Sequence, residues 1–476
     1  MRLPRPPLPL ALGGAGVATL LFPAVAQAHG IVGKADLPIP VWLFSWAAAV
    51  VLVVSFVALS TLWRSPQLQS EHRVRLFALP RFVPHLASVA GMGIFALVVY
   101  SGFAGAQVAT VNFSVTFIYV IFWVGLPVVS VLFGDVFASL SPWRSCARAI
   151  RFTGRRLAPK LFARIPLRYP VKLGMWPAVA VLIGFAWLEL VYVPADRDHP
   201  ATLAALSLAY FLAMLLGMAL FGVEEFSERA DGFGVYFKLF ARMSMLCTEG
   251  RVLYRRRALS GLTGMPVIAG TVGLVCTVIG TTTFDGFSNG GLWRTLEPEL
   301  QSVFATLGFN ETPAVEFTYT LGLLACVALV AGVYRMGIAG VRSVNRRHGM
   351  SELSHSFAHT LVPIGFAYVL AHYFSLLIWQ GQAIGYLASD PLGNGADVFG
   401  TASFQIDYAI VSYAAIWYVQ VAALVTGHVG GLALAHDRAL STYRDTREAV
   451  RSQYWMLAVT VAFTSFGLWL LSSVGT

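Results

Sequence analysis

Repeated apolar runs of about 20 residues constrain this chain more than any other feature of its sequence, because a helix of that length matches the hydrocarbon thickness of a bilayer. Hydrophobic residues make up 57% of the 476 positions and charged residues only 12%, which is more apolar side chain than a soluble core of this length could cover. We therefore predict an all-α, polytopic helical membrane protein whose main partner is the lipid bilayer.

Ten hydrophobic spans are predicted, with ends defined to within about 2–4 residues. They cover residues 41–63, 84–106, 112–134, 175–193, 201–223, 265–284, 316–340, 357–379, 408–430 and 454–474. We treat residues 29–476 as a single helical transmembrane domain.

Residues 1–28 have the pattern of a cleavable signal peptide. Two arginines precede a short apolar stretch that Pro23 interrupts, and Ala26-Gln27-Ala28 has the small-x-small pattern of a signal peptidase site. Cleavage there would make His29 the first residue of the mature chain. An uncleaved anchor helix is the alternative interpretation.

The distribution of basic residues predicts the orientation, because Lys and Arg accumulate on cytoplasmic loops. Alternate loops hold 27 of the 33 basic residues, whereas the opposite face of the mature chain holds only Lys34, Arg197 and Arg294. The basic segments are 64–83, 135–174, 224–264, 341–356 and 431–453. We predict a multi-pass protein of a bacterial-type inner membrane with an N-out/C-out topology and a periplasmic mature N-terminus.

The same bias explains the net charge of +10, so no nucleic acid is expected as a partner. The two longest basic segments, 135–174 and 224–264, are partly amphipathic, which predicts helices lying on an anionic inner leaflet. The outer segments 285–315 and 380–407 are long and acidic, and they are the expected region of substrate access.

Histidines beside the predicted spans 357–379 and 408–430 form the first candidate site. His355 and His359 are one helical turn apart, and His359 and His428 lie at equal depth if the two antiparallel spans touch. Ionisable groups inside a bilayer usually face a partner or a cavity. These three imidazoles are candidate ligands of zinc or copper, with an interhelical hydrogen-bonding pair as the structural alternative.

A second candidate site lies at the outer side. His372 follows His359 by thirteen residues and cannot join the inner histidines, but it could act with Asp285 as a catalytic pair. Asp285 precedes a glycine at the outer end of its span, so an N-cap or turn is the alternative. His29 would offer an α-amine and an imidazole to a metal there. The other polar residues expected on this side are His199, Gln380, Gln382 and Asp407.

Several longer motifs resemble a known family of polytopic bacterial proteins. These are AHGIVGKADLPIPVWLFSWAAAVVLVVSF after the signal peptide, LSPWR, TTFDGF, HTLVPIGFAYVLAHYFSLLIWQGQ and GHVGGLALAH. Over nearly its whole length the chain resembles the fenitrothion hydrolases, which are membrane-bound organophosphorus hydrolases. The resemblance implies hydrolysis of small apolar aryl phosphorothioate triesters, and a metal-bound hydroxide is one way to supply the nucleophile.

Two other function classes stay open at this point. One is a transporter of a small solute or metal, and the other is a redox subunit in which His359 and His428 hold a haem. The sequence contains no P-loop, GxSxG, HExxH or usable GxGxxG motif, so nucleotide-driven transport and serine-hydrolase chemistry have no support.

Overall fold

The computed structural model describes residues 41–162, 166–192, 198–443 and 445–473. The predicted signal peptide and His29 lie outside the described residues. The fold is all-α and polytopic, as predicted.

Seven helical segments of the described chain are long and apolar enough to cross a membrane. Five of them are single helices: α3 (Phe82–Ala104), α11 (Pro200–Phe221), α16 (Glu311–Val344), α20 (Tyr413–Thr442) and α21 (Thr446–Ser473). The sixth is continuous from α4 (Phe113–Thr116) through the π-helix η3 (Phe117–Gly125) to α5 (Leu126–Phe133). The seventh is continuous through α17 (Met350–Phe357), η5 (Ala358–Leu361), α18 (Val362–Trp379), η6 (Gln380–Ala383) and α19 (Ile384–Ser389). The other three predicted spans coincide with helices α2 (Val41–Leu62), α9 (Trp176–Leu190) and α14 (Thr271–Ser288).

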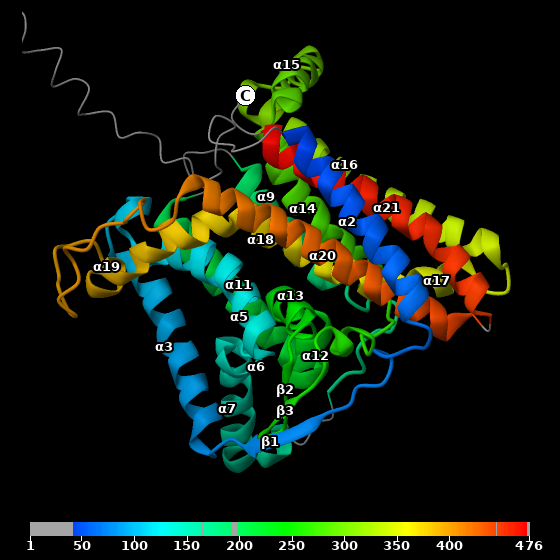
Figure 1. Ribbon diagram of the computed structural model, residues 1–476. Coiled ribbons are helices and arrows are strands. Elements are labelled where there is room, and N and C mark those ends of the chain that lie inside the picture. Colours follow the sequence, from blue (N-terminus) through cyan, green and yellow to red (C-terminus); the bar gives the residue numbers. More distant parts are fainter. Residues whose placement is uncertain (1–40, 163–165, 193–197, 444, 474–476) are drawn as a thin grey trace, which may run out of the picture.

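The long helices form two groups in contact with each other (Figure 1). In the first group, the late helices α16, α18, α20 and α21 pack together with α14, and the early helix α2 lies on α20 and α21. In the second, α3 packs on α11, and α13 (Gly232–Ala241) packs on α5 and α9. Helix α14 joins the groups because it contacts α9 as well as α16 and α18.

Glycines in GHVGGLALAH allow α20 to approach α18 closely. A Cβ atom at Gly427 would lie 2.6 Å from the carbonyl oxygen of Pro363, and one at Gly431 would lie 2.7 Å from that of Thr360. Small residues at a helix interface allow this backbone approach in membrane proteins. A larger side chain at either glycine would separate the helices that carry His372 and His428.

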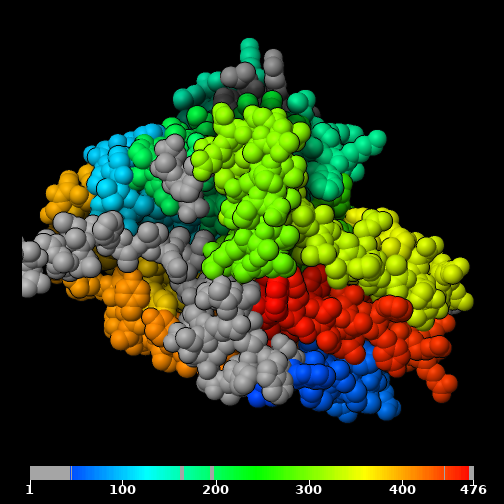
Figure 2. Space-filling view, turned by 90° about the horizontal axis from the view of Figure 1, so that it is seen from above, coloured from blue at the N-terminus to red at the C-terminus, as the bar shows by residue number. Residues whose placement is uncertain are grey.

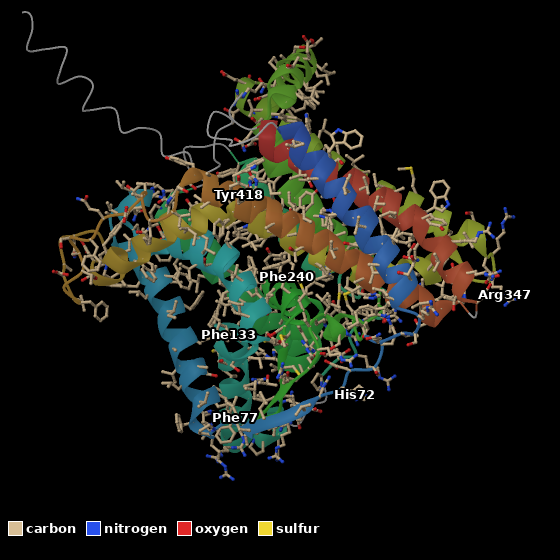
Figure 3. The ribbon with its side chains drawn as sticks, in the orientation of Figure 1. His72, Phe77, Phe133, Phe240, Arg347 and Tyr418 are labelled. Carbon is tan, nitrogen blue, oxygen red and sulfur yellow. The ribbon has the colours of Figure 1, made fainter. Side chains whose placement is uncertain are left out.

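A small antiparallel sheet ties two of the predicted cytoplasmic segments together. Its strand order is β1 (Val74–Ala78), β3 (Val252–Arg255) and β2 (Leu246–Glu249), with Val74 opposite Arg255. The sheet lies at the lower edge of the molecule, where Figure 3 labels Phe77. Segments 64–83 and 224–264 therefore lie on the same side, as the alternation of the spans requires.

A buried carboxylate connects a third basic segment to this side. Asp437 is fully buried near the end of α20, and its side chain accepts hydrogen bonds from Gln67 N (2.6 Å) and Leu68 N (3.2 Å). Trp63 Nε1 (3.1 Å) and Gln69 Nε2 (2.7 Å) also donate to it. The neighbouring His436 places Nε2 3.0 Å from the carbonyl oxygen of Trp63. The end of α20 thus holds the segment that follows α2.

Contacts at the opposite end join predicted outer segments. Ala106 N donates to Leu392 O (2.8 Å), and Ala201 N donates to the side chain of Gln107 (3.1 Å). Helix α15 (Gly291–Thr306) lies on this face in the view from above (Figure 2). The segment 285–315, predicted only as a long loop, thus contains a helix.

The basic segment 135–174 contains the expected amphipathic helix. Ser141 caps α7 (Pro142–Leu157) by accepting from Arg144 N, and Pro142 occupies its first turn. Trp143 is buried, and its Nε1 donates to Asp231 (2.6 Å). The short helices α6 (Phe137–Leu140) and α8 (Pro159–Phe162) flank α7.

The expectation of a surface helix is wrong for part of segment 224–264. Helix α13 is buried, with Phe237 and Phe240 fully inaccessible, and the Phe240 ring lies 5.4 Å from that of Phe366 on α18 (Figure 3). Its aromatic residues stabilise the helix by burial in the protein and not by contact with headgroups. The remaining short elements are α12 (Val223–Arg229), η2 (Ala109–Val111) and η4 (Ser260–Leu262).

An acid-sensitive ion pair is predicted beside the sheet. Arg256, which is 8% exposed, donates to Glu71 (2.5 Å) from its Nη1. Burial raises the pKa of Glu71, but hydrogen bonds from Arg73 and Arg256 outweigh it, so the net pKa lies below the usual value. This stabilisation is present above the unfolded-state pKa near 4.5 and is lost as the pH falls through the lower folded-state pKa.

We expect Glu71→Gln to reduce stability at pH 7 by roughly 0.5–1 kcal/mol, because the pair is partly exposed. The difference between the two proteins should shrink as the pH falls through the lowered folded-state pKa of Glu71. Thermal unfolding in detergent from pH 3 to pH 7 measures it. A difference that does not change with pH would contradict the assignment to this ion pair.

Candidate functional site

A buried carboxylate and two side chains of a neighbouring helix form the most concentrated polar contact between the spans. Asp285 on α14 is fully buried, and its Oδ2 lies 2.7 Å from Nε2 of His372 on α18. The hydroxyl of Tyr373 donates to the same oxygen at 2.7 Å. His372 and Tyr373 are 6% and 3% exposed. The structure therefore brings together the two residues predicted as a catalytic pair.

Asp285 occupies this position because α14 extends beyond the predicted span. The helix continues to Ser288, so Asp285 lies in its last turns and is not an N-cap. Asn289 Nδ2 donates to the backbone carbonyl of Asp285 at 2.8 Å and closes the end of the helix. The alternative interpretation of Asp285 as an N-cap is therefore wrong.

Tyr373 is a site residue that the sequence analysis missed. Its hydroxyl reaches Asp285 although the neighbouring His372 reaches the same oxygen. Consecutive helical residues point about 100° apart, so a shared partner is not expected from their spacing. The available signal was adjacency to a histidine within an apolar span.

A small cavity of about 20 Å³ adjoins His372. Its lining comes from α14, α18, α20 and α21, namely Thr282, Gly286, Tyr368, Ala371, His372, Leu424, Gly467 and Leu470. A cavity of this size holds about one water molecule. A Cβ atom at Gly286 would lie 3.8 Å from Nδ1 and Cε1 of His372, so this glycine keeps the space beside the ring open.

The contact to Asp285 determines which histidine nitrogen is basic. With the carboxylate ionised and the imidazole neutral, Nε2–H donates to Oδ2 and the lone pair is on Nδ1. Asp285 then orients the ring and stabilises the imidazolium that forms on proton uptake. This arrangement can act as a general base, a proton relay or a single oriented metal ligand.

The other predicted outer residues belong to a different contact. Gln382 donates from Nε2 to the carbonyl oxygen of Asp407 (3.1 Å) and accepts from Asp407 N (3.1 Å). Gln380 Nε2 lies 3.3 Å from the Tyr408 hydroxyl. These residues tie η6 to the segment before α20, while His199 directly precedes α11.

The inner histidines do not form the expected interhelical hydrogen-bonding pair. His428 is fully buried, its ring lies 6.1 Å from that of Tyr368, and the next turn of α20 places Gly431 against Thr360, the residue after His359. Nε2 of His359 and Nε2 of His428 are each buried without a hydrogen-bond partner, so these nitrogens do not join the two rings. His355 lies on α17, and its Nδ1 is 2.8 Å from Ser351 O.

Metal ligation by the inner histidines stays a prediction. Among the described residues, no three His, Cys, Asp or Glu side chains are grouped so that they could hold a metal ion, and His355, His359 and His428 are no exception. His428 places Nδ1 2.7 Å from its own helix carbonyl at Leu424. His372 is a suitable single ligand, since Asp285 orients it from Nε2, while the predicted ligand His29 lies outside the described residues.

No family model, curated protein or solved structure matches this chain. The fold and the site are therefore interpreted from their own geometry.

Proposed function

We propose that this chain is a membrane-embedded hydrolase of small apolar organophosphorus triesters of the aryl phosphorothioate type. The observation that carries the proposal is the buried hydrogen bond between Asp285 and His372 beside a cavity of water size. The substrate class comes from the motifs that resemble fenitrothion hydrolases. An apolar triester would also concentrate in the bilayer around the helices.

In the proposed reaction, His372 acts as the general base. Nδ1 takes a proton from a water molecule while the water oxygen forms a bond to phosphorus and the bond from phosphorus to the aryl oxygen breaks. Asp285 stabilises the imidazolium. The hydroxyl of Tyr373 donates a further hydrogen bond to Asp285 and holds its carboxylate in place. The products are a dialkyl thiophosphate and a phenolate, which leaves with little acid assistance.

Substrate binding requires the small cavity to widen. The lining residues Gly286 and Gly467 come from α14 and α21, and both helices end at the face that also carries α15. A metal ion, where one is present, would supply Lewis-acid activation of the phosphorus centre.

Turnover by the purified full chain in proteoliposomes tests the proposal. With a nitrophenyl dialkyl thiophosphate as substrate, we expect release of nitrophenolate, and labelled water should place its oxygen on phosphorus. Metal content is measured on the same preparation. If neither the protein as isolated nor the protein supplied with zinc or copper hydrolyses the ester, the hydrolase proposal is wrong.

The size of the cavity favours a second candidate function. Space for one water beside a fully buried Asp285 is also what a proton relay in a membrane transporter needs. This candidate predicts no ester hydrolysis but proton uptake that depends on Asp285, measured with a pH-sensitive dye inside the vesicles. The two functions therefore give opposite results in one preparation.

We further propose that both chain ends of the mature protein face the periplasm of an inner membrane. The hydrogen bonds at each end of the bundle join segments that the charge bias assigns to one side. A reporter active only outside the cytoplasm should be active when fused after Thr476 and silent when fused at Arg156. The reverse pattern would overturn this orientation.

A further inference from the structure

A second and larger cavity lies at the other end of α18, where the basic segments gather. Its volume is about 300 Å³. The lining combines apolar residues near η4 with polar residues of α17, η5 and α20, namely Leu262, Thr263, Met265, Val267, Glu352, His355, Ser356, His359 and Arg438. The proposed hydrolytic chemistry uses none of these residues.

An imidazole nitrogen in this cavity has no partner in the structure. His359 is 2% exposed, and its Nε2 is buried without a hydrogen bond. Arg438 also has a buried Nε without a partner. Buried polar atoms are nearly always satisfied, so two unpaired nitrogens that line one cavity indicate a bound group that supplies the missing partners.

The charge of the cavity determines the sign of that group. Arg438 donates from Nη2 to the carbonyl oxygen of Thr263 (3.1 Å) and makes no ion pair with any described residue. Its neighbour Asp437 is directed to the segment 63–69. A permanent guanidinium charge at this position opposes a divalent cation and attracts an anion.

The acidic residue of the lining is already engaged. Glu352 is exposed, and its Oε1 lies 2.8 Å from His348 Nδ1. Gly349 N donates to its other carboxylate oxygen at 3.3 Å. Glu352 is therefore engaged by two groups at the start of its own helix, and its negative charge repels an anion beside Arg438 only weakly.

We propose that this cavity binds a phosphate group, from either free phosphate or the headgroup of an anionic lipid. A phosphate monoanion offers acceptor oxygens to Arg438 and both an acceptor and a hydroxyl donor to Nε2 of His359, so it satisfies the imidazole in either tautomer. Val267 is 63% exposed beside the polar residues and provides an apolar neighbour for a lipid chain. The basic segments around the cavity attract anions from both sources.

Ligand-induced stabilisation of the full chain in detergent tests this site. The probes are inorganic phosphate, phosphatidic acid in mixed micelles, and phosphatidylcholine as the zwitterionic lipid. We expect phosphate or phosphatidic acid to raise the unfolding temperature and phosphatidylcholine to have no effect. Native mass spectrometry then shows whether the bound species is the lipid or the free ion.

Two variants and a matched control locate the binding. Arg438→Gln and His359→Leu should each weaken binding of the effective probe by roughly tenfold or more, because charge-assisted hydrogen bonds are lost. Arg451→Gln removes the same charge from an exposed position on α21 and should leave affinity unchanged. His359→Leu removes the unpaired buried nitrogen together with the hydrogen bond of this ring to the Ser356 backbone, so its stability without ligand is measured beside its affinity.

The source of phosphate follows from which probe acts. Stabilisation by phosphatidic acid alone assigns a lipid site, and stabilisation by inorganic phosphate alone assigns a soluble oxyanion site; both support the proposal. No stabilisation by either probe, or equal loss in Arg451→Gln and Arg438→Gln, would overturn it. A His359→Leu protein that is less stable but keeps full affinity would also overturn the role of His359.

Discussion

Replacing Asp285 by Asn is expected to lower the turnover of an aryl phosphotriester by about 10²–10⁴-fold, the range contributed by a positioned acid or base. The Asn amide cannot stabilise an imidazolium at His372, and its NH₂ group favours the tautomer in which Nε2 carries the lone pair. His372→Gln should lose activity to a similar extent, because it removes the base. Initial rates per folded molecule in proteoliposomes measure both effects.

The controls separate catalysis from folding. Tyr373→Phe removes one hydrogen bond to Asp285 and should cost less than tenfold in rate, since His372 remains bound to the carboxylate. Asp407→Asn makes the same chemical change at an exposed residue whose backbone N–H donates to Gln382, and it should leave turnover unchanged. If Asp285→Asn keeps wild-type turnover, the general-base assignment is wrong.

Replacing Asp437 by Ala is expected to have the largest effect on stability, about 3–5 kcal/mol, the range for removing one partner of a buried charged network. The carboxylate accepts from two side chains and two backbone N–H groups between Trp63 and Gln69, and alanine leaves these donors without their acceptor. Reversible unfolding by titration with sodium dodecyl sulfate gives the free energy of unfolding.

Two further substitutions bracket this value. Asp437→Asn retains one acceptor oxygen and should cost roughly half as much as the alanine variant. Glu299→Ala removes an exposed carboxylate of α15 and should change stability by less than about 0.5 kcal/mol. Equal stability of Asp437→Ala and Glu299→Ala would show that the end of α20 does not hold the segment after α2.

Much of the membrane architecture could be predicted from the sequence, because it depends on local composition. Burying the backbone in lipid requires helices, and apolar runs of suitable length mark them wherever they occur. All ten predicted spans coincide with helices of the structure. The deviations are at the ends: α14 ends at Ser288 and not at 284, and α20 ends at Thr442 and not at 430.

The extent of these helices and the way they pack determined which polar residues are in contact. The sequence by itself determined that His372 and Asp285 lie toward the same side and that ionisable groups within spans need partners. Only the tertiary structure decided that α14 contacts α18 in the register that places Asp285 against both His372 and Tyr373. It also left Nε2 of His359 and Nε2 of His428 without a hydrogen bond, although the contact of Gly431 with Thr360 brings their helices together. Hydropathy records how deep a residue lies, whereas side-chain packing between helices determines what it touches.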